Sequence, residues 1–157
     1  YEIRLSLVGS EMCIRDRWSM GQSFVNVRRV EFADTDLAGF VHFSHYLRYM
    51  EETEYAFLRS LGLDVILDDE RGKLGFPRYE SLCRYLSPAR YGQVVDVTLT
   101  VESNDGKRIA YAFDLKVGER KVAEGRLVVV CCRFPADREP FAIPIPDRVL
   151  ERIPLTV

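Results

Sequence analysis

The spacing of hydrophobic residues changes once along this chain, and that change limits the folds open to it. Between residues 44 and 61 apolar side chains recur every three or four positions, which is typical of one face of a helix. After residue 75 apolar and polar residues alternate instead, which is typical of β-strands. The helical face consists of Tyr46, Met50, Thr53, Phe57 and Leu61. The chain is therefore predicted to combine a single long helix with a sheet.

Both ends of this helix carry recognisable signals. Ser44 is a residue type that caps helix N-termini, and Gly62 follows the last apolar position where a left-handed C-terminal cap belongs. The predicted helix spans about 16 residues. The charged residues that lie mostly away from its apolar face are Glu51, Glu52, Glu54 and Arg59.

Five segments have the residue types and the alternation of strands. They are Phe24–Phe32, Tyr79–Leu86, Gln93–Ser103, Arg108–Val117 and Lys121–Phe134. Asn104-Asp105-Gly106 and Gly118-Glu119-Arg120 are hairpin signals, so the last three strands are predicted to form a meander. This order predicts an α+β fold in which a curved antiparallel five-stranded sheet wraps one central helix. Periodicity alone leaves a lipocalin-like or cystatin-like sheet open.

The remaining segments are interpreted as connections. Leu63–Gly75 is a charged, glycine-punctuated connection after the helix. Four prolines, at positions 135, 140, 144 and 146, keep the tail out of any central strand. Asp147–Ile153 is predicted to form a short terminal helix.

The N-terminal segment does not resemble a natural leader. Residues 6–17, SLVGSEMCIRDR, back-translate without a gap into DNA that resembles a sequencing adapter. A secretory signal needs a basic start, an apolar run and a small-residue cleavage site, and residues 1–19 have none of these. We interpret residues 1–19 as non-native and expect one domain over residues 20–157, so that a chain starting at Met20 folds and acts like the full chain.

Composition excludes several classes of protein. The net charge is −2, and removal of residues 1–19 leaves it unchanged, so no nucleic-acid or anionic-membrane partner is predicted. No apolar run approaches the roughly 20 residues that span a bilayer. Cys83, Cys131 and Cys132 have neither C-x-x-C spacing nor a matching pair of histidines. We therefore expect reduced thiols in a soluble, cytoplasmic protein that has no disulfide, metal or cofactor.

One stretch, Glu31–Glu51, concentrates residues that can carry chemistry, and it reads EFADTDLAGFVHFSHYLRYME. It resembles the signature of the 4-hydroxybenzoyl-CoA thioesterase family, in which a D-x-D-x-x-G-x-V segment precedes a tyrosine and, five positions later, an acidic residue. The matching positions are Asp34, Asp36, Gly39, Val41, Tyr46 and Glu51. The resemblance covers nearly everything from Val25 to Phe134, and it implies the hotdog fold.

Thioester hydrolysis needs a base or nucleophile near the carbonyl carbon and N–H donors for the oxyanion. A carboxylate placed just before a helix can act as the base or nucleophile. The N–H groups of the first helical turn lie next to it and lack intrahelical partners, so they can act as the oxyanion donors. The resemblance implies that Asp36 is the catalytic carboxylate. The backbone amides near His42 and Phe43 are the expected oxyanion donors. Asp34 is expected to brace the loop by accepting backbone hydrogen bonds.

Several other residues are candidates for the same site. The resemblance makes Glu51 a second-rank catalytic residue, although a salt-bridged helix surface is the alternative. The His42 side chain is expected to orient water or contact the acyl carbonyl, while His45 is expected to be structural. Gly39 and Tyr46 are expected to contact substrate. Lys107 and Arg108 lie where the family places basic residues against the phosphates of CoA, and solubility is the alternative role for both.

These observations predict an acyl-CoA thioesterase that releases the free acid and CoA. The alternatives are a hotdog module that binds an acyl thioester without efficient hydrolysis, or an acyl-carrier-protein thioesterase or dehydratase relative. A purely structural protein is disfavoured by two carboxylates in one loop. Because a five-stranded sheet leaves an exposed edge, a homodimer or homotetramer is also predicted.

Overall fold

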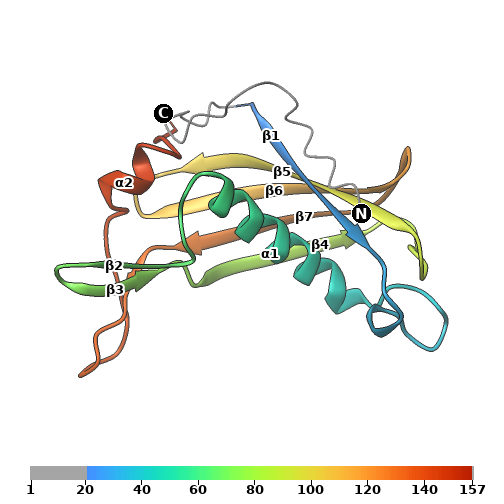
Figure 1. Ribbon diagram of the computed structural model, residues 1–157, viewed down its shortest axis with the longest axis horizontal. Helices are drawn as coiled ribbons and strands as arrows, with labels where there is room; N and C mark the ends of the chain where they lie inside the picture. The colour runs from blue at the N-terminus through green and yellow to red at the C-terminus, as the bar shows by residue number, and fades with distance from the viewer. Residues whose placement is uncertain (1–20, 157) are drawn as a thin grey trace.

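A five-stranded antiparallel sheet forms the main layer of the molecule (Figure 1). The structure, a computed structural model, describes residues 21–156, so residues 1–19, interpreted above as non-native, lie outside the described residues. The strands lie in the order β1-β5-β6-β7-β4. Their bounds are β1 Ser23–Arg29, β4 Arg78–Tyr85, β5 Val94–Asn104, β6 Arg108–Val117 and β7 Arg120–Val130. Both predicted hairpins are present, joining β5 to β6 and β6 to β7.

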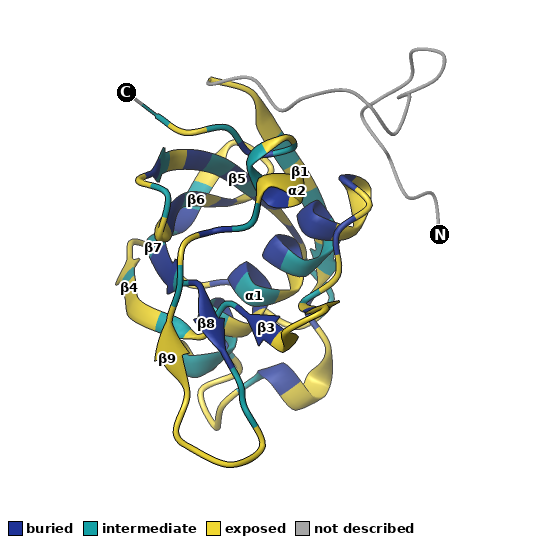
Figure 2. Ribbon diagram, turned by 90° about the vertical axis from the view of Figure 1, so that its left-hand side faces the viewer, coloured by how far each residue is buried: buried dark blue, intermediate teal, exposed yellow. Residues whose placement is uncertain are grey.

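The helix α1, Phe43–Ser60, lies along the concave side of this sheet. Figure 2 shows the strands curling around it. All five residues of the predicted apolar face are buried. Because the strands curve around the helix, the sheet covers most of this apolar face. The fold prediction is confirmed, because a curved antiparallel sheet around one central helix is the hotdog arrangement.

Two predicted boundaries at the start of the chain are wrong by a few residues. The first strand ends at Arg29 because Phe32–Asp34 turns into a short 3₁₀ helix. α1 begins at Phe43, and its N-terminal cap is His42 instead of Ser44. The His42 ring does the work of a capping hydroxyl, because its Nδ1 accepts the Ser44 N–H.

A second, smaller antiparallel sheet was not predicted. It has the order β2-β3-β8-β9 and lies at the end of the molecule where α1 ends (Figure 1). Its strands are β2 Ile66–Asp69, β3 Gly72–Gly75, β8 Cys132–Arg133 and β9 Phe141–Ala142. The segment expected as a charged connection thus contains a hairpin, and the last predicted strand is split after Val130. The terminal helix α2 is also shorter than predicted, at Asp147–Leu150.

The α1 side chain Met50 approaches the sheet closely at Gly125 in β7. A Cβ atom at this position would overlap the thioether of Met50 and would lie 2.9 Å from the Leu82 carbonyl oxygen. Met50 is fully buried. The missing side chain of Gly125 therefore provides the space that the Met50 side chain fills.

Glu54, which was expected to lie away from the apolar face, is 1% exposed. Its carboxylate forms an ion pair with Arg78 at the start of β4. Burial raises the pKa of Glu54 to about 7, against the opposing effect of Arg78. The loss of hydration therefore outweighs the attraction of the guanidinium at this site.

The burial of Glu54 predicts a pH dependence of stability. The folded protein holds the Glu54 proton up to a pKa of about 7, and the unfolded chain releases it near 4.5. The contribution of this group to the free energy of unfolding should therefore fall as the pH rises from 4.5 to 7, by on the order of 3 kcal/mol. Glu54→Gln should remove that fall in urea titrations made across this pH range.

Glu51→Gln is the matched control, because Glu51 contacts the same Arg78 guanidinium from a half-exposed position. This variant should keep most of the wild-type fall in unfolding free energy, because the Glu51 charge is the smallest contribution to the raised pKa of Glu54. Parallel pH curves for Glu54→Gln and the wild type would contradict the assignment of the raised pKa to Glu54.

Candidate active site

The Asp36 carboxylate lies at the turn of a short hairpin just before α1. The hairpin is closed by an isolated bridge between Thr35 and Val41 and by the Asp36 N–H, which donates to the Phe40 carbonyl at 2.8 Å. Gly39 has a φ of +78°, a left-handed conformation that glycine adopts without strain. The role of Gly39 in this geometry is to allow the turn.

One oxygen of the Asp36 carboxylate is fixed and the other is free. Oδ1 accepts the N–H groups of Ala38 at 2.8 Å and Phe40 at 3.2 Å. Among residues 21–156, no donor bonds Oδ2, and the residue is exposed. An anchored carboxylate with one unoccupied oxygen can accept a proton or attack an electrophile without first breaking a protein contact.

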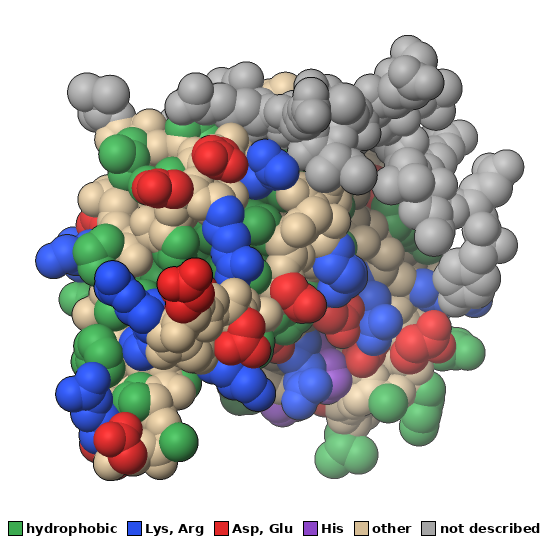
Figure 3. Space-filling model, turned by 60° about the vertical axis from the view of Figure 1, so that its left-hand side comes forward, with side chains coloured by type: hydrophobic (Ala, Val, Ile, Leu, Met, Phe, Trp, Pro, Cys, Tyr) green, Lys and Arg blue, Asp and Glu red, His purple; other side chains and the backbone are tan. Residues whose placement is uncertain are grey.

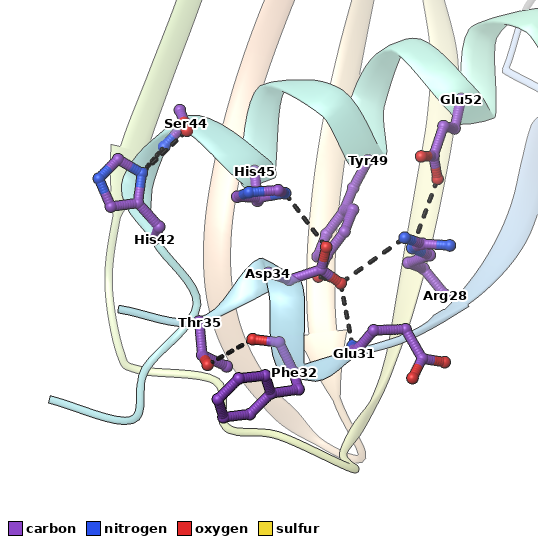
Figure 4. A network of polar contacts seen from close by, with 10 residues as sticks. All are labelled: Arg28, Glu31, Phe32, Asp34, Thr35, His42, Ser44, His45, Tyr49 and Glu52. Carbon is purple, nitrogen blue, oxygen red and sulfur yellow. Dashed lines mark hydrogen bonds and ion pairs between the residues drawn. The ribbon is translucent and has the colours of Figure 1, made fainter. Parts of the chain in front are cut away.

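Asp34, two residues earlier, has the opposite environment (Figure 4). It is 4% exposed. Its Oδ2 accepts the Glu31 N–H at 3.0 Å and the Tyr49 hydroxyl at 2.8 Å, while His45 Nδ1 lies 3.2 Å from Oδ1. An Arg28 guanidinium nitrogen lies 3.6 Å from Oδ2. Asp34 therefore braces more than the loop, because its partners come from β1, the 3₁₀ turn and α1.

The phenol of Tyr49 is held in its protonated form by this environment. Burial raises the pKa of Tyr49 far above its usual value, and the hydrogen bond to Asp34 raises it further. Arg28 lies over the Tyr49 ring, with 5.4 Å between the guanidinium carbon and the ring centroid. Tyr49 is thus a permanent hydrogen-bond donor to Asp34 over the physiological pH range.

The first turn of α1 offers a backbone donor that no group within residues 21–156 uses. The His42 N–H donates to the Asp34 carbonyl at 2.8 Å, and the Ser44 N–H donates to His42 Nδ1 at 3.4 Å. Within the described part of the chain, the Phe43 N–H has no acceptor. Of the two backbone positions expected to stabilise an oxyanion, only Phe43 has its N–H available.

The cap also sets the proton of the His42 ring. A backbone N–H can only donate, so the Nδ1 that accepts the Ser44 N–H carries no proton. The neutral His42 ring then has its proton on Nε2, which is a donor. The Ser44 hydroxyl lies 2.8 Å from the same Nδ1, in an arrangement that serves the helix cap.

Two aromatic residues support this turn from β4 and from within the helix. The Tyr85 hydroxyl donates to the Phe43 carbonyl at 3.1 Å, and the rings of Tyr85 and Tyr46 meet edge to face. Tyr46 is buried, and its hydroxyl accepts the Ala89 N–H at 3.4 Å. Burial raises the pKa of Tyr46. In this geometry Tyr46 packs under the site, and the exposed Phe43 side chain is the more accessible aromatic surface.

Glu51 lies farther along α1 and contacts no residue of the Asp36 hairpin. Its Oε1 lies 3.5 Å from an Arg78 guanidinium nitrogen and accepts the Tyr55 hydroxyl at 3.2 Å. Burial, with the nearby Glu51 charge, raises the pKa of Tyr55. Within one chain, the structure therefore separates Glu51 from Asp36 instead of bringing them together.

The basic residues at the β5–β6 turn lie at the other end of the molecule. The Arg108 Nε donates to Asp105 at 3.1 Å, and its guanidinium lies over the Tyr79 ring. Lys107 is exposed and has no ion-pair partner among the described residues. The turn adjoins the tail of the chain, because the Ile145 N–H donates to the Gly106 carbonyl at 2.8 Å.

A cavity of about 570 Å³ lies between the small sheet and the tail, and Ile145, which is bonded to Gly106 of this turn, is one of its lining residues. Arg71 and Arg138 line it without ion-pair partners among the described residues, whereas Arg133 is paired with Asp69. Basic and acidic side chains are intermingled over the face in Figure 3. Arg138 lies over the Phe141 ring, with 4.8 Å between its guanidinium carbon and the ring centroid. The sequence analysis missed Arg71 and Arg138, because three separate segments form the cavity.

Residues 21–156 contain neither a metal-binding cluster nor a membrane-spanning helix. That range holds no cluster of three or more His, Cys, Asp or Glu side chains suited to a metal ion. No helix within it is long and apolar enough to cross a membrane.

Comparisons with known proteins place this geometry in context. The family model described as the Thioesterase-like superfamily matches residues 30–153. A putative esterase of Aquifex aeolicus is 32% identical, with 82% of this chain and 95% of the relative covered. A 1,4-dihydroxy-2-naphthoyl-CoA hydrolase of Thermosynechococcus vestitus is 32% identical over 76% of this chain and 81% of the relative. The solved structure of a gentisyl-coenzyme A thioesterase is 27% identical, with a TM-score of 0.69, and covers 80% of this chain and 98% of that protein.

Proposed function

We propose that this chain, which belongs to the thioesterase-like superfamily, is an enzyme that hydrolyses the thioester of a small-molecule acyl-CoA to the free acid and CoA. The observation that carries the proposal is the Asp36 carboxylate, anchored through Oδ1 and open at Oδ2. It lies just before the helix turn whose Phe43 N–H is unused. We assign Asp36 as the base or nucleophile and the Phe43 N–H as an oxyanion donor.

Two routes give the same products from this geometry. As a nucleophile, Oδ2 bonds to the carbonyl carbon, the C–S bond breaks, and water then hydrolyses the mixed anhydride to the acid and free Asp36. As a base, Oδ2 takes a proton from the attacking water and the CoA thiolate leaves and is protonated. In both routes the Phe43 N–H and the His42 Nε2–H are the proposed donors to the developing oxyanion.

Hydroxylated aromatic thioesters are the substrates to test first. Two of the relatives are named for the 1,4-dihydroxy-2-naphthoyl and gentisyl groups. The finer resemblance to 4-hydroxybenzoyl-CoA thioesterases points to the same class of acyl group. The exposed Phe43 ring beside the site supports this choice.

Free thiols at Cys83, Cys131 and Cys132 support the cytoplasm as the compartment.

We further propose that the active form is at least a dimer, paired along β4. This strand is the last in the sheet order, and its apolar residues Tyr79, Leu82 and Tyr85 are all exposed. Ser81 faces the helix side by alternation, yet it is exposed too, so α1 of the same chain does not cover this edge. An unpaired apolar edge is a template for pairing with a second copy.

Two-fold pairing along β4 also suits the position of the basic residues. The Asp36 hairpin and the small sheet lie at opposite ends of one chain (Figure 1). Antiparallel pairing brings the Tyr85 end of one β4 beside Arg78 of the partner subunit, so each Asp36 hairpin comes near the partner's small sheet. The cavity lined by Arg71 and Arg138, which form no salt bridge within residues 21–156, is then suited to hold the phosphates of CoA together with Lys107 and Arg108.

Asp36→Asn should lower kcat by roughly 100-fold or more and leave the melting temperature close to that of the wild type. The asparagine keeps the Oδ1 that accepts the Ala38 and Phe40 N–H groups, but it can neither accept a proton nor attack a carbonyl. Thiol release from a panel of aromatic, short and long acyl-CoAs measures this effect.

Asp105→Asn is the matched control, because Asp105 Oδ1 accepts two backbone N–H groups in an exposed turn in the same way. It should keep wild-type kcat. Wild-type turnover by Asp36→Asn would refute the mechanism. If the wild type releases no thiol from any acyl-CoA but binds one, the protein is an acyl-thioester-binding module instead.

Replacement of Lys107 and Arg108 together by alanine should raise KM for acyl-CoA about tenfold with little change in kcat. Phosphate contacts far from the reacting carbon bind substrate and transition state equally. The Arg71→Ala, Arg138→Ala pair should act in the same way. Arg29→Ala with Lys116→Ala removes the same charge from exposed strand positions and should leave KM unchanged. Equal KM changes in all three double variants would show that the loss of positive charge, and not the loss of a phosphate contact, raises KM.

Leu82→Lys should shift the protein from dimer toward monomer, because a charged side chain on an edge strand opposes pairing. Val27→Lys is the control on the opposite edge strand β1, where Val27 is 42% exposed against 51% for Leu82. Light scattering at micromolar concentration distinguishes the two variants. A wild-type monomer, or dissociation caused by Val27→Lys alone, would contradict pairing along β4.

A further inference from the structure

The side chains around Asp34 join the catalytic hairpin to the helix that supports it. Figure 4 shows His45 and Tyr49, one turn apart on α1, pointing at the two sides of one carboxylate. His45 Nδ1 lies 3.2 Å from Oδ1 and the Tyr49 hydroxyl lies 2.8 Å from Oδ2. Neither residue contacts Asp36 itself.

The backbone of Asp34 also joins the Asp36 hairpin to α1. Its carbonyl accepts the N–H of His42, the residue that caps α1. Because Asp34 lies two residues before Asp36, any rotation of Asp34 moves both the Asp36 carboxylate and the cap that orients the Phe43 N–H. One residue thus sets the position of the base relative to the oxyanion donor.

The Asp34 carboxylate is well suited to hold that position. It is buried, and charge-assisted hydrogen bonds to a buried carboxylate are stronger and more directional than those between neutral groups. Arg28 is held between the carboxylates of Asp34 and Glu52, at 3.6 Å and 3.5 Å, so the charge of Asp34 is balanced without a contact to the site. Two donors, the Glu31 N–H and the Tyr49 hydroxyl, and the His45 ring, whose Nδ1 lies 3.2 Å from Oδ1, define its orientation.

From this geometry we infer that His45 and Tyr49 are positioning residues for the reaction, acting through Asp34 to hold Asp36 and the Phe43 N–H at a fixed separation. The inference rests on the proposed thioester hydrolysis. It predicts that replacing His45 or Tyr49 lowers kcat although neither residue touches the substrate, because small displacements of reacting groups lower the rate by large factors.

Tyr49→Phe should lower kcat about tenfold at 25 °C and change KM less than twofold, since a displaced base weakens the transition state without weakening substrate binding. Thr53→Val is the matched control. Thr53 is buried on the next turn of α1, and its hydroxyl accepts a hydrogen bond from Asn26 of β1 and donates to the Tyr49 carbonyl. Thr53→Val should lower the melting temperature about as much as Tyr49→Phe does, but it should leave kcat unchanged.

Replacement of His45 separates hydrogen bonding from packing. His45→Asn keeps an N–H donor near the position of Nδ1 and should retain most of the kcat. His45→Leu removes the donor and should reproduce the loss seen in Tyr49→Phe. Equal kcat values for the two His45 variants would overturn the positioning role of His45.

Amide hydrogen exchange tests the same inference without substrate. The N–H groups of Asp36 and His42 are bonded within the hairpin and to Asp34. Their exchange should become at least tenfold faster in Tyr49→Phe and remain unchanged in Thr53→Val. If the wild type hydrolyses no acyl-CoA, the proposed function fails and the exchange result alone decides the positioning. Unchanged exchange, or an equal loss of kcat in Tyr49→Phe and Thr53→Val, overturns the inference.

Discussion

The burial of one face of α1 in the concave side of the main sheet determines where backbone groups can meet a ligand. The middle of the helix has all its N–H and carbonyl groups bonded internally, so only its ends can offer them. At the N-terminal end the cap occupies the Ser44 N–H, and the Phe43 N–H has no acceptor in the part of the chain that the structure describes. The hairpin that carries Asp36 enters at that end, so the location of the proposed site follows from helix packing and does not require a deep cleft.

The two aspartates of the D-T-D segment show how burial divides roles between identical side chains. Asp34 accepts two protein hydrogen bonds through Oδ2, has the His45 ring beside Oδ1, and is closed to solvent. Asp36 uses one oxygen for two backbone N–H groups and keeps the other free. A reacting group needs an available lone pair and a fixed direction, and only Asp36 has both. Glu51 has a carboxylate as well, but Arg78 and Tyr55 hold it away from the hairpin.

Sequence reasoning succeeded where local patterns determine structure, and it failed where distant segments do. The change in hydrophobic period predicted α1, the five main strands and both hairpins, because periodicity reports directly on which face is buried. The β2–β3 hairpin was missed since four-residue strands are too short to establish alternation. The burial of Glu54 depends on Arg78, and the cavity at Arg71 and Arg138 depends on three segments. No local pattern contains that information. The capping role of His42 was missed because histidine is an uncommon cap, although its place directly before the helix was visible.

The missing side chain of Gly125 is bordered by two groups of different mobility. A larger residue at 125 would displace the Met50 thioether, the end of a flexible side chain, but its Cβ would still lie 2.9 Å from the Leu82 carbonyl oxygen, which is a backbone atom. A smaller residue at 50 would leave a void beneath the helix without removing that second contact. Among descendants of this protein, position 50 should therefore vary more freely than position 125.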